Sequence, residues 1–232
     1  MPGKHLKAIF IVCVTVCVAL LATGNLSAQE EAACFDCHEA GDDSPVHAVF
    51  KTVHGSLGSG GTAACTACHG PSEAHNRRGR RNPPDISFGP RWPSDVETRN
   101  GSCLNCHENG DQLLWAGSSH EQENISCDSC HDSHALQDLQ LAKEQAQEQC
   151  LTCHTDVKAQ IHLPSRHPIA EGKTACVDCH NPHGSLGDAA LHQASVNDNC
   201  YSCHQDKRGP FLWEHPPVAE DCALCHRPHG SV

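Results

Sequence analysis

Sixteen cysteines of this chain form eight pairs with one spacing, Cys-x-x-Cys, and a histidine follows the second cysteine of every pair. We number these motifs 1 to 8 along the chain. Their cysteines are Cys34 with Cys37, Cys65 with Cys68, Cys103 with Cys106, Cys127 with Cys130, Cys150 with Cys153, Cys176 with Cys179, Cys200 with Cys203, and Cys222 with Cys225. Their histidines are His38, His69, His107, His131, His154, His180, His204 and His226. Two thiols at this spacing attach c-type haem through thioethers, and the adjacent imidazole, the proximal ligand, binds the iron. The pattern therefore predicts eight covalently bound haem c groups.

The amino end has the pattern of an export signal. Lys4 and Lys7 precede an apolar run from Ala8 to Ala22, and Leu26-Ser27-Ala28 follows it. This order is typical of a secretory signal peptide that is cleaved after Ala28, and the run is short for a membrane anchor. We expect residues 1–28 to be removed and the remaining protein to reach the periplasm.

Zinc sites and a disulfide framework are the alternatives for paired cysteines. Neither requires a histidine directly after every second cysteine. Zinc ribbons also favour reducing compartments, whereas an exported chain meets an oxidising one. Haem attachment is therefore the favoured interpretation.

Composition agrees with a chain that needs cofactors in order to fold. Leu, Ile, Val and Phe supply only 30 of the 204 residues after Ala28, a fraction that by itself predicts disorder. Eight porphyrins would provide the missing buried apolar surface, so we expect no folding without them. The formal net charge of -12 argues against nucleic acid as a partner.

The second axial ligand of each iron is also predicted to be histidine. The only methionine is Met1, which leaves with the signal peptide, so we expect bis-His ligation and low potentials. The motifs group into four modules, each with a spacer histidine between its two motifs and a closing histidine after the second. The spacer histidines are His54, His120, His167 and His215, and the closing histidines are His75, His134, His183 and His229.

Three further histidines compete for these positions or are surplus. His47 is an alternative to His54, His162 is an alternative to His167, and His192 is left over. Most closing histidines lie three residues after a proximal histidine, too near to reach the opposite face of the same haem. They are therefore predicted to bind a neighbouring haem.

The fold class that follows is a multihaem cytochrome c of mostly coil with short α-helices, little or no β-structure and an elongated haem-wire architecture. The predicted modules cover residues 29–75, 101–134, 135–183 and 184–232, with a Pro/Arg-rich linker at 76–100. A helix is expected over Ala135 to Cys153, where Leu, Ala, Glu and Gln dominate. The linker arginines Arg77, Arg78, Arg80 and Arg81 either are solvated or pair with haem propionates or an acidic partner.

The second half of the chain resembles a known family. Three stretches are similar to MtrA/DmsE-type periplasmic multihaem cytochromes: Ser165-Arg166-His167-Pro168, Cys176 to Ser185, and Val196 to Ser231 with Gly209-Pro210-Phe211-Leu212-Trp213-Glu214-His215-Pro216. The resemblance implies a haem wire that takes electrons from a periplasmic donor cytochrome. It also implies insertion in an outer-membrane porin-like barrel and delivery to an extracellular cytochrome or reductase. The best-known members carry ten haems, so eight motifs imply an octahaem version or a shorter soluble relay.

Two other functions remain open from the sequence. A multihaem reductase of nitrogen or sulfur oxyanions needs an iron with an open position, often marked by a Lys in place of the proximal His or by a crosslinking Tyr. Here all eight motifs end in His, and Tyr201 lies inside motif 7, so an electron carrier is favoured over an enzyme. A haem-stacking filament subunit is the third possibility.

Overall fold

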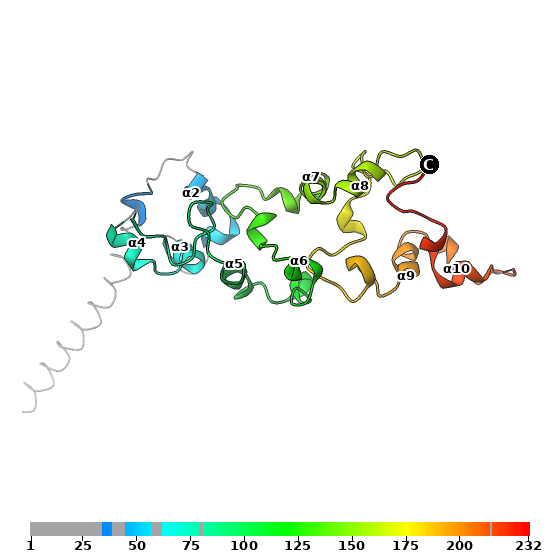
Figure 1. Ribbon diagram of the computed structural model, residues 1–232, viewed down its shortest axis with the longest axis horizontal. Helices are drawn as coiled ribbons and strands as arrows, with labels where there is room; N and C mark the ends of the chain where they lie inside the picture. The colour runs from blue at the N-terminus through cyan, green and yellow to red at the C-terminus, as the bar shows by residue number, and fades with distance from the viewer. Residues whose placement is uncertain (1–33, 39–44, 57–61, 79–80, 214) are drawn as a thin grey trace, which may run out of the picture. The chain divides into compact units, whose positions relative to one another are not determined.

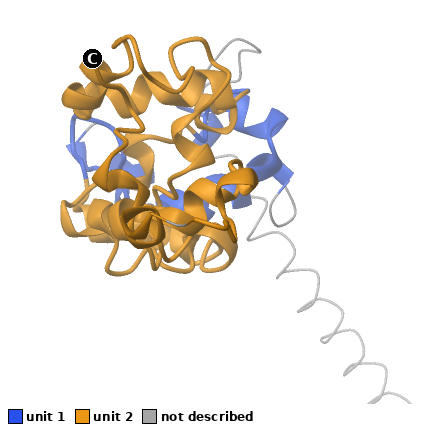
Figure 2. Ribbon diagram, turned by 90° about the vertical axis from the view of Figure 1, so that its right-hand side faces the viewer, with its two compact units in different colours: residues 1–93, 133–136 blue, residues 94–132, 137–232 orange. Residues whose placement is uncertain are grey.

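The computed structural model describes residues 34–38, 45–56, 62–78, 81–213 and 215–232 (Figure 1). The predicted signal peptide and Arg80 lie outside these residues. The described chain groups into two compact units (Figure 2). Unit 1 contains the described residues up to Pro93 together with Ser133–Leu136, and unit 2 contains Ser94–Asp132 and Gln137–Val232.

Unit 1 holds motifs 1 and 2 on short helices. Its α-helices are α2 (Pro45–Ala48), α3 (Thr62–His69) and α4 (Glu73–Arg78), and its 3-10 turns include η1 (Val49–Lys51) and η2 (Val53–Ser56). Helix α3 contains the whole of motif 2, so one helix positions both thiols and the proximal imidazole.

Unit 2 holds motifs 3 to 8. Its α-helices are α5 (Val96–Leu104), α6 (Ser119–Gln122), α7 (Lys143–Cys153), α8 (Thr155–Gln160), α9 (Val196–Tyr201) and α10 (Pro216–Glu220). Its 3-10 turns are η4 (Gly110–Gln112), η5 (Cys127–Ser129), η6 (Leu139–Leu141), η7 (Cys176–Asp178), η8 (Asp188–Ala190), η9 (Gln205–Lys207) and η10 (Cys222–Leu224). In Figure 1 the α5–α6 and α7–α8 segments run along opposite sides of this unit.

The modules of unit 2 repeat one local arrangement. The first motif of each module begins near the end of an α-helix, namely α5, α7 or α9, and the second motif begins with a 3-10 turn, namely η5, η7 or η10. Side-chain caps fix where two of these helices start, because Asp95 accepts a hydrogen bond from Thr98 N and Ser195 accepts one from Asp198 N. The module repeat of the sequence is therefore also a repeat of backbone structure.

The prediction of one helix over Ala135 to Cys153 is wrong for the first half of this stretch. Helix α7 begins only at Lys143, after the 3-10 turn η6, and Ala142 is extended with φ -99° and ψ 104°. Asp138 accounts for the break, because its carboxylate accepts a hydrogen bond from Gln140 N and so starts η6 instead of continuing an α-helix.

Few apolar side chains are buried within the described part of the chain. The buried hydrophobic residues are Val49, Ala64, Trp115, Ala146, Ile161, Ile169 and Ala175. The described residues form no β-strand, and their isolated bridges pair Ser165 with Ser231 and His180 with Leu191. The predicted fold class of short helices and coil is confirmed. No helix among the described residues has the length and apolar character needed to cross a membrane.

Candidate haem sites

Each motif folds as a single helical turn. In motifs 1 and 3 to 8 the histidine N–H donates to the carbonyl of the first cysteine, at 2.9–3.0 Å. Motif 2 lies inside α3 and has the same local geometry. Residues three and four positions apart in such a turn lie on one side of it. Both thiols and the imidazole of a motif therefore face the same way, as attachment to one porphyrin requires.

The first cysteines of the two motifs in a module contact each other throughout unit 2. The thiols of Cys103 and Cys127, of Cys150 and Cys176, and of Cys200 and Cys222 lie close enough together that one thiol of each pair shifts the pKa of the other. The neighbouring Cys127 thiol lowers the pKa of the Cys103 thiol, and the neighbouring Cys150 thiol lowers the pKa of Cys176. In unit 1, Cys34 raises the pKa of Cys65 through its charge, after the larger effect of burial.

The second cysteines approach each other between modules. The pKa of the Cys130 thiol is raised by burial and then by the charge of Cys153, and that of Cys179 is raised by burial, by Asp178 and by Cys203. In unit 2 the attachment points therefore follow one another in space in the order of motifs 3 to 8.

Four second cysteines lie outside these contacts between motifs. They are Cys37, Cys68, Cys106 and Cys225. Three of them, Cys37, Cys106 and Cys225, are exposed, and Cys68 is half-buried within α3. Each exposed one is placed by the turn of its own motif, because its N–H donates to the carbonyl of the first cysteine at 3.1–3.4 Å. Their role in attaching haem therefore stays a prediction from the motif.

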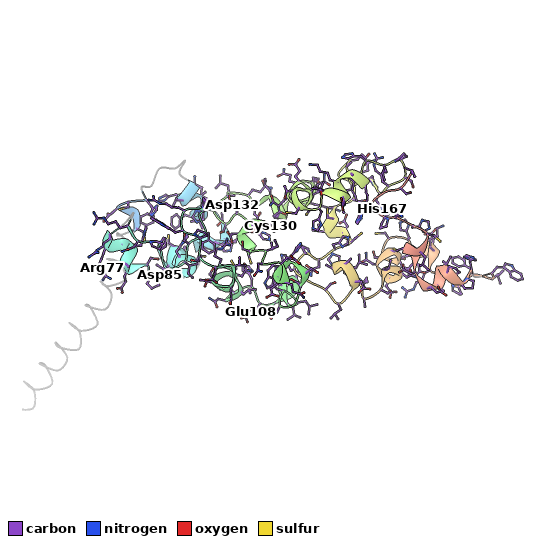
Figure 3. The ribbon with its side chains drawn as sticks, in the orientation of Figure 1. Arg77, Asp85, Glu108, Cys130, Asp132 and His167 are labelled. Atoms are coloured by element: carbon purple, nitrogen blue, oxygen red, sulfur yellow. The ribbon has the colours of Figure 1, made fainter. Side chains whose placement is uncertain are left out.

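Six imidazole pairs bring a proximal histidine opposite a predicted distal one, always within one unit. The ring-centre distances are 6.2 Å for His38–His75, 6.2 Å for His69–His134, 6.2 Å for His120–His154, 6.0 Å for His131–His183, 6.1 Å for His167–His204 and 6.0 Å for His180–His229. His167, from the irregular segment after α8, is labelled in Figure 3.

This spacing fits two imidazoles on opposite sides of one iron. An imidazole nitrogen lies about 2.0 Å from a bound metal ion and the ring centre roughly 1 Å farther back, so the two ring centres are about 6 Å apart. Ordinary aromatic pairs also fall in this range. What distinguishes these six pairs is that each joins one proximal histidine to one spacer or closing histidine, with nearly constant spacing.

Hydrogen bonds orient six of these twelve rings so that Nε2 is left to bind a metal. In each of the six, Nδ1 contacts an oxygen at 2.5–3.0 Å, so Nδ1 carries the proton and Nε2 the lone pair. The contacts are His69 to Ile86 O, His75 to Asn82 O, His120 to Pro182 O, His131 to Asp138 Oδ2, His167 to Pro228 O and His180 to Ala189 O.

Two of the surplus histidines have the opposite orientation. His47 uses Nε2 to contact His38 O at 2.8 Å, and His192 uses Nε2 to contact Val177 O at 2.9 Å. His47 also packs between Phe35 and Phe50. The nitrogen that would bind iron is thus engaged with the backbone, which favours structural roles for these two rings. The third, His162, is exposed.

Burial keeps several of the paired imidazoles neutral, which is the form that binds metal. Desolvation is the largest cause that lowers the pKa of His69, His183 and His229. Neighbouring histidines lower the pKa further, including His134 for His69 and His131 for His183.

A Pro-His-Gly sequence joins successive modules of unit 2. In the first copy, Pro182 O accepts the Nδ1 hydrogen bond of His120, and His183 lies opposite His131. Gly184, with φ +111°, lies so close to Leu114 O that a Cβ atom would be 2.2 Å from it. Three consecutive residues thus contact the module that covers residues 101–134.

The second copy repeats these contacts one module later. Pro228 O contacts His167, His229 lies opposite His180, and a Cβ atom on Gly230 would be 2.0 Å from Gln160 O. The proline carbonyl and the glycine were not identified from the sequence, although the repeated Pro-His-Gly-Ser around both closing histidines was a visible signal.

Four predicted ligands lie outside these pairs. His54 is in η2 of unit 1, and His107 follows α5 in unit 2. His215 precedes α10, and His226 ends the turn of motif 8. Their roles as axial ligands stay predictions from the module pattern.

The predicted linker takes part in ligand placement. Ile86 O and Asn82 O hold His69 and His75, and the Asp85 carboxylate accepts a hydrogen bond from Ser72 N at 2.8 Å. Arg77 forms an exposed ion pair with Glu73 at 3.6 Å. Figure 3 labels Arg77 and Asp85 at this end of unit 1. The 76–100 segment is therefore partly a scaffold for histidines, a role that its Pro- and Arg-rich composition did not indicate.

The sixteen motif cysteines, all of which are described, form no disulfide with one another. Across the described ranges, no group of three or more His, Cys, Asp or Glu side chains is arranged to hold a metal ion directly.

Comparison with known proteins identifies haem-binding families along much of the chain. Family models match residues 2–81 (NapC/NirT cytochrome c family, N-terminal region), 65–144 (cytochrome c-type protein NrfB-like) and 167–209 (doubled CXXCH motif). The multiheme cytochrome MtrA of Shewanella baltica (strain OS185) is 43% identical over 204 residues, which are 86% of this chain. The chain spans 60% of the length of that relative. Together with the repeated motifs, these matches identify the chain as a multihaem c-type cytochrome.

Proposed function

We propose that this protein is an octahaem electron carrier in which the side chains described above hold the haems within transfer distance of one another. The observation that carries the proposal is the set of six pairs of proximal and distal imidazoles, each with ring centres 6.0–6.2 Å apart. When bound, haem c supplies an iron that alternates between ferric and ferrous states, and bis-imidazole ligation favours low potentials.

The thiol contacts support transfer along the chain in sequence order. Within a module the first cysteines meet, as Cys150 and Cys176 do, and between modules the second cysteines interact, as Cys130 and Cys153 do. Each motif of unit 2 thus has its sequence neighbours as its spatial neighbours. A linear order of cofactors is the arrangement that relays electrons, whereas substrate chemistry requires only one reactive iron.

Spacer and closing histidines connect successive modules of unit 2. His120 faces the proximal histidine of the first motif of the next module, and His183 faces that of the second motif of the module before. Both of these ligand pairs therefore cross a module boundary. These shared ligands tie neighbouring modules together and so hold the spacing of their haems. Loss of one module would also remove ligands from the haems of its neighbours.

The proposal is tested by removing one distal imidazole from the exported holoprotein. The variant His183→Ala is expected to create one haem that binds carbon monoxide when reduced, whereas the wild type binds little. His192→Ala, which removes a ring whose Nε2 contacts Val177 O, is the matched control and should leave the spectrum unchanged. Carbon monoxide binding to the wild type at several haems would instead favour a reductase with open iron positions.

We further propose that the protein works in the periplasm and across the outer membrane, inside a porin-like barrel. The support is the resemblance of its second half to MtrA/DmsE-type cytochromes and its 43% identity to a multiheme cytochrome MtrA. A tagged exported protein should co-elute with an outer-membrane barrel protein from detergent-solubilised outer membranes. Recovery of all haem protein in the soluble periplasmic fraction, with no such barrel, would contradict the conduit and favour a soluble relay.

A further inference from the structure

The paired rings of the two units differ in what accepts the hydrogen bond from Nδ1. Five of the six Nδ1 contacts described above go to backbone carbonyls. The sixth goes from His131 to Oδ2 of Asp138 at 2.5 Å, and this acceptor is a carboxylate. Among these six rings, the one in motif 4 is thus the ring whose Nδ1 contacts an acidic side chain.

The structure holds this carboxylate in place. Asp138 begins the turn η6, and its Oδ1 accepts a hydrogen bond from Gln140 N at 3.0 Å while Oδ2 faces His131. Its side chain is only 18% exposed. Because both oxygens have partners and solvent access is limited, the carboxylate is oriented toward the imidazole and only partly screened by water.

A hydrogen bond from Nδ1 to a carboxylate changes how strongly Nε2 of the same ring donates electrons to an iron. A charged acceptor draws the Nδ1 proton away from the ring, which raises the basicity of Nε2 and gives it more anionic character. A more basic ligand stabilises the oxidised iron relative to the reduced iron and so lowers its reduction potential.

Motif 6 is a matched comparison in the same unit. His180 faces His229 at 6.0 Å with rings 29° apart, and His131 faces His183 at 6.0 Å with rings 19° apart. His180 donates to the carbonyl of Ala189, a neutral acceptor, at 2.8 Å. The two sites therefore share ligand types and geometry and differ mainly in the charge of the acceptor.

We propose that Asp138 sets the haem of Cys127, Cys130 and His131 at a lower reduction potential than the haem of Cys176, Cys179 and His180. The inference rests on the proposed bis-imidazole haems. Asp138 is a positioning residue, since it acts through His131. An electron passing along unit 2 meets a less favourable step at motif 4 than at motif 6, so Asp138 shapes the energy profile of the relay.

The test is a potentiometric titration of the exported holoprotein and of Asp138→Asn, with absorbance of the haem α-band as the readout. The expected result is that one of eight redox components moves to higher potential while the others stay in place. Asp95→Asn is the control, because Asp95 also starts a helical segment, α5, with its carboxylate bonded to Thr98 N at 2.8 Å. It removes the same charge and a similar cap and should move no component comparably. Asp138→Glu should return the moved component toward its wild-type position.

Intact mass and spin state separate failure of this inference from failure of the proposed function. A titration of Asp138→Asn that superimposes on wild type, with eight haems attached and low-spin spectra, overturns the role of Asp138 alone. A wild type with fewer haems or with high-spin iron overturns the proposed function. If Asp138→Asn loses a haem, Asp138→Ser, which keeps an N-cap oxygen without the charge, provides the same comparison. An upward shift supports the inference and an unchanged titration overturns it.

Discussion

Motifs 4 and 6 occupy equivalent positions in successive modules, yet their surroundings differ in one chemical respect. Both are second motifs that begin with a 3-10 turn, η5 or η7, and both face a closing histidine of the next module. The acceptor behind the proximal ring is Asp138 at motif 4 and Ala189 O at motif 6. The module repeat therefore sets ligand geometry, whereas the segment after each motif sets the electrostatic environment of the ligand.

The largest effect is expected when both cysteines of motif 4, or both cysteines of motif 6, are replaced. Cys127→Ala combined with Cys130→Ala should lower the intact mass of the exported protein by one haem, and Cys176→Ala with Cys179→Ala should do the same. Because each pair lies at a contact between motifs, both variants should also unfold at lower temperature than wild type. Retention of all eight haems in either variant would contradict covalent attachment at that motif.

Replacing the distal ligands should change potentials equally at the two sites. His183→Met and His229→Met should each raise the potential of one haem, because His/Met ligation favours ferrous iron more than bis-His ligation does. The difference between the two sites should persist, since Asp138 acts on the proximal ring. Titrations that show unequal shifts, or none, would show that these closing histidines do not bind equivalent irons.

The glycines of the Pro-His-Gly sequences should be intolerant of a side chain. A Cβ atom would lie 2.2 Å from Leu114 O in Gly184→Ala and 2.0 Å from Gln160 O in Gly230→Ala. Overpacking of this kind costs roughly 1–3 kcal/mol, so thermal unfolding of the holoprotein should begin at lower temperature in both variants.

Gly101→Ala is the control for the glycine variants. Gly101 lies inside α5, and a Cβ atom added there would have nothing within 4 Å, so alanine should stabilise the helix by about 0.5–1 kcal/mol. If all three substitutions change the unfolding temperature equally, Gly184 and Gly230 are not required for close contact between modules.

The smallest effect is expected at a histidine outside the ligand pairs. His47→Ala removes an Nε2 contact to His38 O and packing against two phenylalanines, so it should reduce stability slightly without altering spectra or potentials. A shift in the potential of one haem would instead assign His47 as an axial ligand, the alternative to His54 that the sequence left open.

The local geometry of the eight motifs could be predicted from the sequence because it depends on spacing alone. A helical turn brings residues at positions one, four and five together wherever Cys-x-x-Cys-His occurs, so local sequence determines local geometry. The prediction of coil with short helices also followed from composition, since Gly, Pro and Asn interrupt most segments.

The partners of each ring could not be read in the same way, because they come from distant segments. His131 and His183 are 52 positions apart, and Nδ1 of His167 contacts the carbonyl of Pro228, 61 positions away. Every residue has a backbone carbonyl, so the residue type does not indicate which carbonyl accepts a hydrogen bond from a ligand. Asp138 was hidden for another reason: it lies in a stretch whose composition predicts a continuous helix, and its carboxylate starts a 3-10 turn there, so that the α-helix begins only at Lys143.

The measurement that tests the central claim most directly is the intact mass of the exported protein, purified without reduction or haem extraction. We predict a polypeptide that carries eight covalently attached haems, one on each pair of cysteines from Cys34 and Cys37 at motif 1 to Cys222 and Cys225 at motif 8. A mass that corresponds to fewer haems, or to the bare polypeptide, would contradict this prediction.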